Sequence, residues 1–359
     1  MLHARSELPF NSHYPSFKIQ HSIFNTSDVN SFSYTRAEAV ESAVRDVAQD
    51  TTAKFIAGGT NILDLMKENV ERPERLIDIT RLPLQQIENL PDGGLRLGAL
   101  VTNADTAYHP EVEQRYPLLS KTILAGASAQ LRNMATNGGN LFQRTRCYYF
   151  YDTATPCNKR EPGSGCSAIN GYNRILAILG TSESCIATHP SDMAVALAAL
   201  KATVRVTGPN GERTLEMADF HRLPGHEPQY DNNLAPGELV TAIDLPAKGF
   251  AQHYTYLKLR DRASYAFALV SVAVGLELEG DTIQEARIAL GGVAHMPWRK
   301  PEAEALLIGQ KATKETFGKA AAALLKGAKG YGSNTFKLEL APRAIVRALT
   351  EATTMQQLS

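Results

Sequence analysis

The chain has 359 residues, 43% of them hydrophobic and 21% charged, so it can bury a substantial core and has the length of two or three domains. Its 37 basic and 37 acidic side chains give a formal net charge of zero, which argues against a nucleic-acid partner and against an anionic membrane surface. The longest apolar run, residues 266–276, is well short of the roughly 20 residues that a membrane-spanning helix needs, so no membrane insertion is expected.

The first 32 residues are polar, with scattered aromatic side chains, and lack the apolar centre of a secretory signal. Residues 1–32 are therefore interpreted as an N-terminal arm, mobile or in contact with a partner. These features predict a soluble protein that either stays in the cytoplasm or reaches the periplasm by co-export with a signal-bearing partner.

A glycine-rich loop follows the first predicted elements. Helical spacing of apolar residues predicts a helix over residues 36–48, capped by Thr35. A short strand at 54–57 then leads through Gly-Gly-Thr-Asn at 58–61 into a helix beginning at 62–67. Adjacent glycines allow positive φ and a close approach to a ligand, while the free amides at the start of a helix attract negative charge. A tight turn without any ligand has the same sequence, so this loop alone is weak evidence.

A second glycine pair occurs about 80 residues later. Strands are predicted at 76–79 and 94–99, and a helix over 118–131 leads into Thr-Asn-Gly-Gly-Asn at residues 136–140. Two loops of this kind could clamp the two phosphates of a dinucleotide from opposite sides. The pair is therefore more specific than either loop alone.

Five motifs in a fixed order carry a family resemblance. They are Phe55-Ile56-Ala57-Gly58-Gly59-Thr60-Asn61, Thr136-x-Gly138-Gly139-Asn140-Leu141, Ser191-Asp192, Lys258-x-x-x-Arg262-x-x-x-Ala266 and Gly291-Gly292-Val293-Ala294. Over about residues 33–350 the chain resembles the FAD-binding subunit of molybdenum hydroxylases, the group of xanthine dehydrogenase, carbon monoxide dehydrogenase and aldehyde oxidoreductase. It is most similar to the [4Fe-4S]-containing flavin subunit of bacterial periplasmic-type aldehyde oxidoreductases, because it carries a cysteine-bearing insertion.

The resemblance implies an α+β fold in two domains after the arm. Residues 33–247 would form a two-subdomain FAD-binding domain of the PCMH type, with the insertion at 142–187. Residues 248–359 would form a C-terminal domain like that of the carbon monoxide dehydrogenase flavoprotein, with a three-stranded antiparallel sheet and helices.

The resemblance also assigns the residues that bind FAD. They are Ala57, Gly58, Gly59, Thr60, Asn61, Thr136, Gly138, Gly139, Asn140, Thr188, Ser191, Asp192 and Lys258. Arg260 and Arg262 compete with Lys258 for its place near the flavin, and a solvated basic strand end would have the same sequence. No catalytic side chain is expected, because the flavin itself carries the redox chemistry.

The insertion of about 46 residues contains every cysteine of the chain and is longer than an ordered connection usually is. The four residues are Cys147, Cys157, Cys166 and Cys185. Their spacing leaves open two disulfides, a structural zinc site, an iron–sulfur cluster or free thiols, and its irregularity favours the cluster. The resemblance implies a [4Fe-4S] cluster with these four ligands. Four basic residues of the insertion would help to neutralise it: Arg144, Arg146, Lys159 and Arg160.

The leading functional hypothesis is an FAD-binding electron-transfer subunit of a molybdenum-dependent aldehyde oxidoreductase. Its partners in a heterotrimer would be a large molybdenum-cofactor subunit and a small [2Fe-2S] subunit, and FAD would pass electrons to an external acceptor. One alternative is a self-sufficient FAD oxidoreductase of the same fold. Another, from a different class, is a zinc-stabilised binding or scaffold protein.

Overall fold

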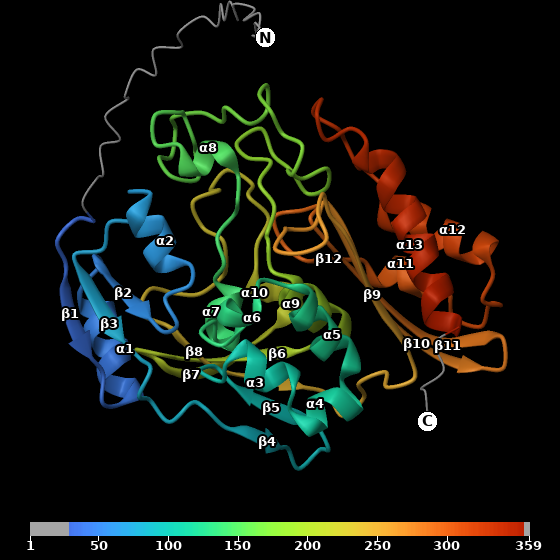
Figure 1. The fold of residues 1–359 in the computed structure, drawn as a ribbon, viewed down its shortest axis with the longest axis horizontal. Coiled ribbons are helices and arrows are strands. Elements are labelled where there is room, and N and C mark those ends of the chain that lie inside the picture. The colour runs from blue at the N-terminus through green and yellow to red at the C-terminus, as the bar shows by residue number, and fades with distance from the viewer. Residues whose placement is uncertain (1–28, 355–359) are drawn as a thin grey trace, which may run out of the picture.

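The computed structural model describes residues 29–354, so the predicted arm at 1–32 lies almost entirely outside the described residues. Figure 1 shows three sheets side by side, with the N-terminal sheet at the left, the central sheet at the bottom and the C-terminal sheet at the right. Residues 142–187, here called the cysteine segment, lie above the central sheet and between the two outer parts (Figure 1). This mixture of helices and separate sheets confirms the expected α+β fold class.

The N-terminal sheet has three parallel strands in the order β1-β3-β2. Its strands and helices are β1 (Ser33–Arg36), α1 (Val40–Gln49), β2 (Ala53–Ile56), α2 (Ile62–Lys67) and β3 (Arg75–Asp78). The prediction that Thr35 caps a helix over residues 36–48 is wrong at its beginning, because Thr35 lies in β1 and pairs with Ile77 of β3. The pairing with a distant strand outweighs the local capping signal.

The central sheet has five antiparallel strands in the order β4-β5-β8-β6-β7. Their bounds are β4 (Ile87–Asn89), β5 (Leu95–Gly98), β6 (Thr203–Gly208), β7 (Gly211–Glu216) and β8 (Leu239–Leu245). The cysteine segment is inserted between β5 and β6 in the chain, so both of its ends start from this sheet and its covering helices.

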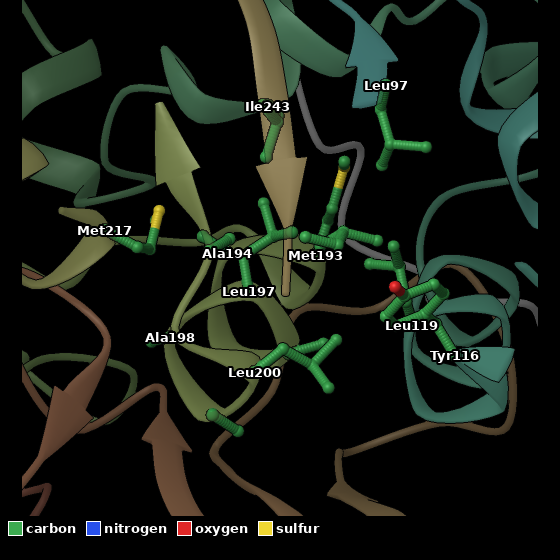
Figure 2. Packing of buried hydrophobic residues seen from close by; sticks show 14 of the residues in the cluster. Leu97, Tyr116, Leu119, Met193, Ala194, Leu197, Ala198, Leu200, Met217 and Ile243 are labelled. Carbon is green, nitrogen blue, oxygen red and sulfur yellow. The ribbon is translucent and has the colours of Figure 1, made fainter. Parts of the chain in front are cut away.

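One buried helix, α9 (Asp192–Leu200), forms the centre of the main core. Every residue of α9 after Asp192 is buried, so the helix has no polar face. It packs against Leu97 of β5 and Ile243 of β8, as Figure 2 shows. Ser191 Oγ caps α9 by accepting a hydrogen bond from the N–H of Ala194 at 2.9 Å. Core packing of α9 thereby fixes the positions of Ser191 and Asp192.

Short helices cover the central sheet around α9. They are α3 (Asn103–Ala107), α4 (Pro110–Arg115), α5 (Pro117–Ala125), α6 (Ala129–Arg132), α7 (Asn137–Leu141) and α10 (Met217–Phe220). The helix expected over residues 118–131 is divided into α5 and α6, because Gly126 ends α5 and Ala127 takes a φ of +50°. A left-handed residue cannot continue a right-handed helix.

The C-terminal sheet is antiparallel in the order β12-β11-β10-β9. Its elements are β9 (His253–Leu259), β10 (Val270–Glu279), β11 (Thr282–Gly291), β12 (Trp298–Arg299), α11 (Pro301–Ala305), α12 (Lys314–Leu324) and α13 (Lys337–Thr354). The three predicted strands are present, and the expectation of a three-stranded sheet is corrected to four by the two-residue β12. Trp298 of β12 pairs with Leu290 of β11. No helix within residues 29–354 is long and apolar enough to span a membrane.

Lys337, the first residue of α13, joins the cysteine segment to the C-terminal sheet. Its side chain is fully buried and donates hydrogen bonds to the carbonyl oxygens of Leu176, at 2.9 Å, and Gly292, at 2.7 Å. Lys337 forms no ion pair with any residue in the described range 29–354. Burial without a counter-charge lowers the pKa of Lys337 to about 7.

Replacing Lys337 with Met should change how stability depends on pH. The unfolded chain has a lysine pKa of about 10.4, so between pH 7 and 10 it binds more protons at this position than the folded chain does. The free energy of unfolding of the wild type, minus that of Lys337→Met, should therefore rise with pH, by at most about 1.4 kcal/mol per pH unit. Urea denaturation at several pH values measures this difference. A difference that stays constant or falls would show that burial does not depress this pKa.

Candidate functional site

The first glycine loop, residues 57–61, joins β2 to α2 and lies against the backbone that leads into α7. A Cβ atom added to Gly58 would lie 1.8 Å from the carbonyl oxygen of Met134, so only glycine permits this approach. Gly59 has a φ of +71°, in the left-handed region that favours glycine. Gly58 is thus required by close packing, and Gly59 by its backbone conformation.

The first loop presents unused hydrogen-bond donors. The backbone N–H groups of residues 58–61 find no acceptor among residues 29–354. Asn61 accepts a hydrogen bond from the N–H of Arg144 at 2.9 Å through Oδ1, while its Nδ2 is buried without a partner in the described chain. Because buried donors are normally paired, these groups are suited to the oxygens of a bound ligand.

The second glycine pair has a different conformation from the one expected. Residues 137–141 form α7, and neither Gly138 nor Gly139 has a positive φ. Thr136 is the N-cap, and its Oγ1 accepts a hydrogen bond from the N–H of Gly139 at 3.2 Å. Gly138 packs on Ala99 and donates its N–H to the Ala99 carbonyl oxygen at 2.8 Å. The expected positive-φ turn is therefore wrong, and these glycines serve close packing at a helix start.

Three predicted residues beyond the loops lie close to one another through α9 and β9. Ser191 donates a hydrogen bond to Asn140 Oδ1 at 2.5 Å, and Lys258 donates one to Asp192 Oδ2 at 2.7 Å. The side chain of Lys258 is 5% exposed and that of Asp192 10%. The structure therefore brings residues 140, 191–192 and 258 together, although 118 positions separate the first from the last.

A cleft of about 750 Å³ opens beside these residues, a size typical of ligand sites. A second pocket, of about 410 Å³, adjoins it and shares Thr60 and Gly139 with it. The larger cleft is lined by Asn140, Asp192 and Lys258, the second pocket by Ala57, Gly58, Gly59, Asn61, Thr136 and Gly138, and a small adjoining pocket by Thr188, Ser191 and Asp192. Every residue that the resemblance assigned to FAD thus lines one of three neighbouring hollows.

Several residues that line the larger cleft were not predicted. They are Arg132, Arg146, Tyr148, Tyr265 and Phe267 among others. Arg262 also lines it, whereas Arg260 does not, so of the two competitors of Lys258 only Arg262 reaches the cleft. Ala127 and Tyr265 are non-glycine residues with positive φ at its rim, a strain that is common at functional sites. These positions lie in loops or in helices of four residues, so no helical or strand period marks them in the sequence.

The four cysteines line one narrow pocket in the cysteine segment. All four are free thiols; Cys147, Cys157 and Cys185 are buried, and Cys166 is half-buried. Cys157 and Cys166 face each other in an antiparallel bridge. No three His, Cys, Asp or Glu residues of the described chain are arranged to hold a single metal ion. Of the alternatives that the spacing left open, neither two disulfides nor a site for a single zinc ion is formed among residues 29–354.

Burial sets the chemistry of these thiols. It raises the pKa of Cys147 to about 12 and that of Cys185 to about 11. Peptide N–H groups of Tyr149 and Phe150 point at the Cys147 sulfur, and the N–H of Ala187 donates to Cys185 Sγ at 3.4 Å. Buried thiols with raised pKa values are poor nucleophiles, so Cys147 and Cys185 are unsuited to covalent catalysis.

The basic side chains of the cysteine segment are mostly compensated within the protein. Arg144 pairs with Glu71 and with Asp231, the latter at 2.8 Å. Lys159 pairs with Asp231 at 2.6 Å. Although burial opposes it, the charges of Lys159 and Arg144 hold the pKa of Asp231 well below its usual range. Arg146 pairs with Asp64, and Arg160 donates to three backbone carbonyls. Lys159 also lines the cysteine pocket, and that these four charges help to neutralise a cluster stays a prediction.

Three buried histidines lie next to Asp231 and were not predicted as site residues. The rings of His189 and His221 lie 4.1 Å apart between centroids, and His295 Nε2 lies 3.6 Å from Asp231 Oδ1. Burial lowers the pKa of His221 to about 4 and that of His295 to about 3. These imidazoles are neutral at pH 7 and contribute packing and polar contacts below the cleft.

Comparison with known proteins agrees with this geometry. Residues 30–248 match the FAD binding domain in molybdopterin dehydrogenase, and residues 254–352 match the CO dehydrogenase flavoprotein C-terminal domain. The chain is 50% identical to the aldehyde oxidoreductase FAD-binding subunit PaoB of Escherichia coli, over 90% of this chain and 99% of that protein. It is 26% identical to the glyceraldehyde dehydrogenase medium chain of Sulfolobus acidocaldarius, over 89% and 98%.

Solved structures show the same fold. A chain of the reconstituted CO dehydrogenase from Oligotropha carboxidovorans superposes with a TM-score of 0.71 at 25% identity, covering 91% of this chain and 99% of that chain. A chain of quinoline 2-oxidoreductase from Pseudomonas putida 86 superposes with a TM-score of 0.69, also at 25% identity, over 90% and 98%. Two matching domain families, a half-identical relative and the shared fold lead to one assignment: the chain belongs to the family of FAD-binding subunits of molybdenum hydroxylases, which are oxidoreductases.

Proposed function

We propose that this chain is the FAD-carrying electron-transfer subunit of a molybdenum-dependent aldehyde oxidoreductase. The observation that carries the proposal is the convergence of all thirteen predicted FAD-binding residues on adjoining hollows whose first loop offers unused donors. The half-identical relative that is named an aldehyde oxidoreductase subunit supports the substrate class. When bound, FAD supplies the capacity to accept electrons from other centres and to release them to an acceptor.

The protein's own part is to hold the two ends of the cofactor. The free amides of residues 58–61 and the buried Nδ2 of Asn61 fit the diphosphate, near the place where the two larger hollows share Thr60 and Gly139. Asp192 and Lys258 compensate each other at the wall of the larger cleft, where the flavin ring would lie. The arrangement orients the cofactor and sets the charge around it.

We further propose that Cys147, Cys157, Cys166 and Cys185 hold a [4Fe-4S] cluster. Their convergence on one pocket, their burial and the peptide donors aimed at their sulfurs fit such a cluster. The four cysteines line one pocket without forming a site for a single ion, and a cube of four irons needs more room than one ion does, so this arrangement fits the cluster better than zinc.

We propose the roles of the three subunits from the family resemblance. Substrate oxidation would occur in a large molybdenum-cofactor subunit, and a small [2Fe-2S] subunit would deliver electrons to this chain in a heterotrimer. We propose residues 33–247 as the FAD-binding domain and 248–359 as the C-terminal domain, with residues 1–32 as an arm toward a partner.

We propose two compartments for the protein, the periplasm, reached by co-export with a signal-bearing partner, or the cytoplasm. Cell fractionation distinguishes the two.

The substitution Gly58→Ala should weaken FAD binding. Its new Cβ would collide with the Met134 carbonyl oxygen, so the first loop must move away from the second and its donors lose their alignment. We expect at least a tenfold rise in the dissociation constant, or about 1.4 kcal/mol. Titration of the deflavinated protein with FAD, followed by fluorescence, measures it.

The matched control is Gly318→Ala in α12, where an added Cβ meets no atom within 4 Å. This variant should bind FAD like the wild type and unfold at the same or a higher temperature. Unchanged FAD affinity in Gly58→Ala would contradict the placement of the cofactor at the first loop.

The substitution Cys157→Ser should remove the cluster while most FAD binding survives, because Cys157 does not line the cleft. Iron and flavin analysis with absorption spectra of anaerobically purified protein should give about four irons and one FAD per wild-type chain. The variant should lose the broad iron–sulfur absorbance and keep the flavin bands. If the wild type contained flavin but no iron, the cluster proposal would be refuted while the FAD proposal would stand. Zinc without flavin would favour the zinc-stabilised scaffold protein. Reduction of the flavin by an aldehyde in the absence of any partner would favour the self-sufficient FAD oxidoreductase.

A further inference from the structure

Arg146 connects the cysteine pocket with the larger cleft. It immediately precedes Cys147, and it lines the larger cleft as well as the small pocket beside Thr188. The cysteine segment therefore supplies a cation to a cleft whose other predicted lining residues come from the two glycine loops, α9 and β9.

The guanidinium of Arg146 is held in place by neighbours on two sides. Its Nη1 donates hydrogen bonds to Asp64 Oδ2, at 2.9 Å, and to the hydroxyl of Tyr151. The ring centroid of Phe267 lies 5.1 Å from the guanidinium carbon, and that of Tyr151 lies 5.8 Å from it. These contacts restrict the side chain before any ligand enters.

Two donors of this fixed group are unused. Neither Nε nor Nη2 of Arg146 has a hydrogen-bond partner in residues 29–354. Nε is buried, whereas Nη2 is not fully buried, so Nη2 is the donor that a ligand in the cleft can reach. An unpaired N–H of a charged group is costly to bury, and such cases call for an explanation in an absent ligand or water. The neighbouring Arg144, Lys159 and Arg160 differ, because none of their side-chain nitrogens is buried without a partner in this range.

The surroundings of Arg146 favour the ring system of the cofactor over its diphosphate. Phe267, which packs on the guanidinium, lines the larger cleft together with Ile175 and Leu269. Apolar and aromatic walls suit a planar ring, whereas the unused backbone amides that suit phosphate belong to residues 58–61.

We propose that Arg146 donates a hydrogen bond from Nη2 to an oxygen of the isoalloxazine ring of FAD bound in the larger cleft. Arg146 is then a cofactor-contacting residue that the cysteine segment supplies to the flavin site. This inference rests on the proposed function. Because a reduced flavin carries more negative charge than an oxidised one, the cation should stabilise the reduced form and raise the flavin midpoint potential.

The test compares Arg146→Gln with Arg343→Gln in the full chain, purified anaerobically with its cofactors. Arg343 lies in α13 and pairs with Glu339 at 3.3 Å, and neither residue lines the cleft, so its substitution makes the same charge change elsewhere. Spectroelectrochemistry gives the flavin midpoint potential, and iron analysis reports whether the cysteine segment is intact. Arg146→Gln should bind reduced flavin about tenfold more weakly relative to oxidised flavin, a fall of about 30 mV for two electrons. Arg343→Gln should leave the potential unchanged.

Arg146→Lys keeps the charge but lacks the guanidinium and its Nη2, and it provides the same test if the glutamine variant loses iron or fails to fold. Arg146→Lys should lower the flavin midpoint potential, but by less than Arg146→Gln does. The contact between Arg146 and the flavin ring would be overturned if Arg146→Gln and Arg146→Lys both retained FAD and the wild-type midpoint potential. It would also be overturned if these variants bound FAD more weakly without any change in potential. Either result would leave the proposed function standing. A wild-type chain that binds no FAD would instead overturn the proposed function, and this contact with it.

Discussion

The approach of Gly58 to the carbonyl oxygen of Met134 is the contact on which the rest of the site depends. It joins the loop after β2 to the segment before α7, and thus the N-terminal sheet to the helices of the central sheet. Gly138 continues the same packing by sitting on Ala99. Because the backbones touch directly, the side chains and amides around them are left free to face the hollows on either side.

Buried charges hold the cysteine segment against this junction. The segment has one short helix, α8 (Tyr148–Tyr151), and otherwise consists of turns, so regular hydrogen bonding does not order it. Asp231 pairs with Lys159 and Arg144, and the backbone of Arg144 reaches Asn61 of the first loop. At the other side Lys337 binds the carbonyl of Leu176. Loss of Asp231 would leave the buried Lys159 without a counter-charge, whereas Arg144 would keep Glu71, and an unpaired buried cation is far more costly than the loss of a surface ion pair.

The residues that the family resemblance assigns to FAD line three neighbouring hollows, and they could be named from the sequence because the motifs are short and local. The first loop was predicted with its strand and helix, since β2, the glycines and α2 are consecutive in the chain. The conformation of the second pair was not, because glycine permits a helix start as readily as a left-handed turn. Thr35 was misassigned since pairing with Ile77, 42 residues away, decides its conformation. Arg146 and Phe267 meet only in the folded chain, and neither follows a period that sequence patterns can detect.

We propose that FAD binds where the first glycine loop meets the segment before α7, and that the cluster-bearing cysteine segment contributes Arg146 to the same cleft. A crystal structure of the anaerobically purified protein, with anomalous scattering recorded at the iron absorption edge, tests it most directly. The account predicts FAD in the cleft beside Lys258 and Arg146, with its diphosphate at residues 58–61, and one compact iron peak enclosed by the four cysteines. FAD density away from the first loop, or iron bound anywhere but between these cysteines, would contradict it.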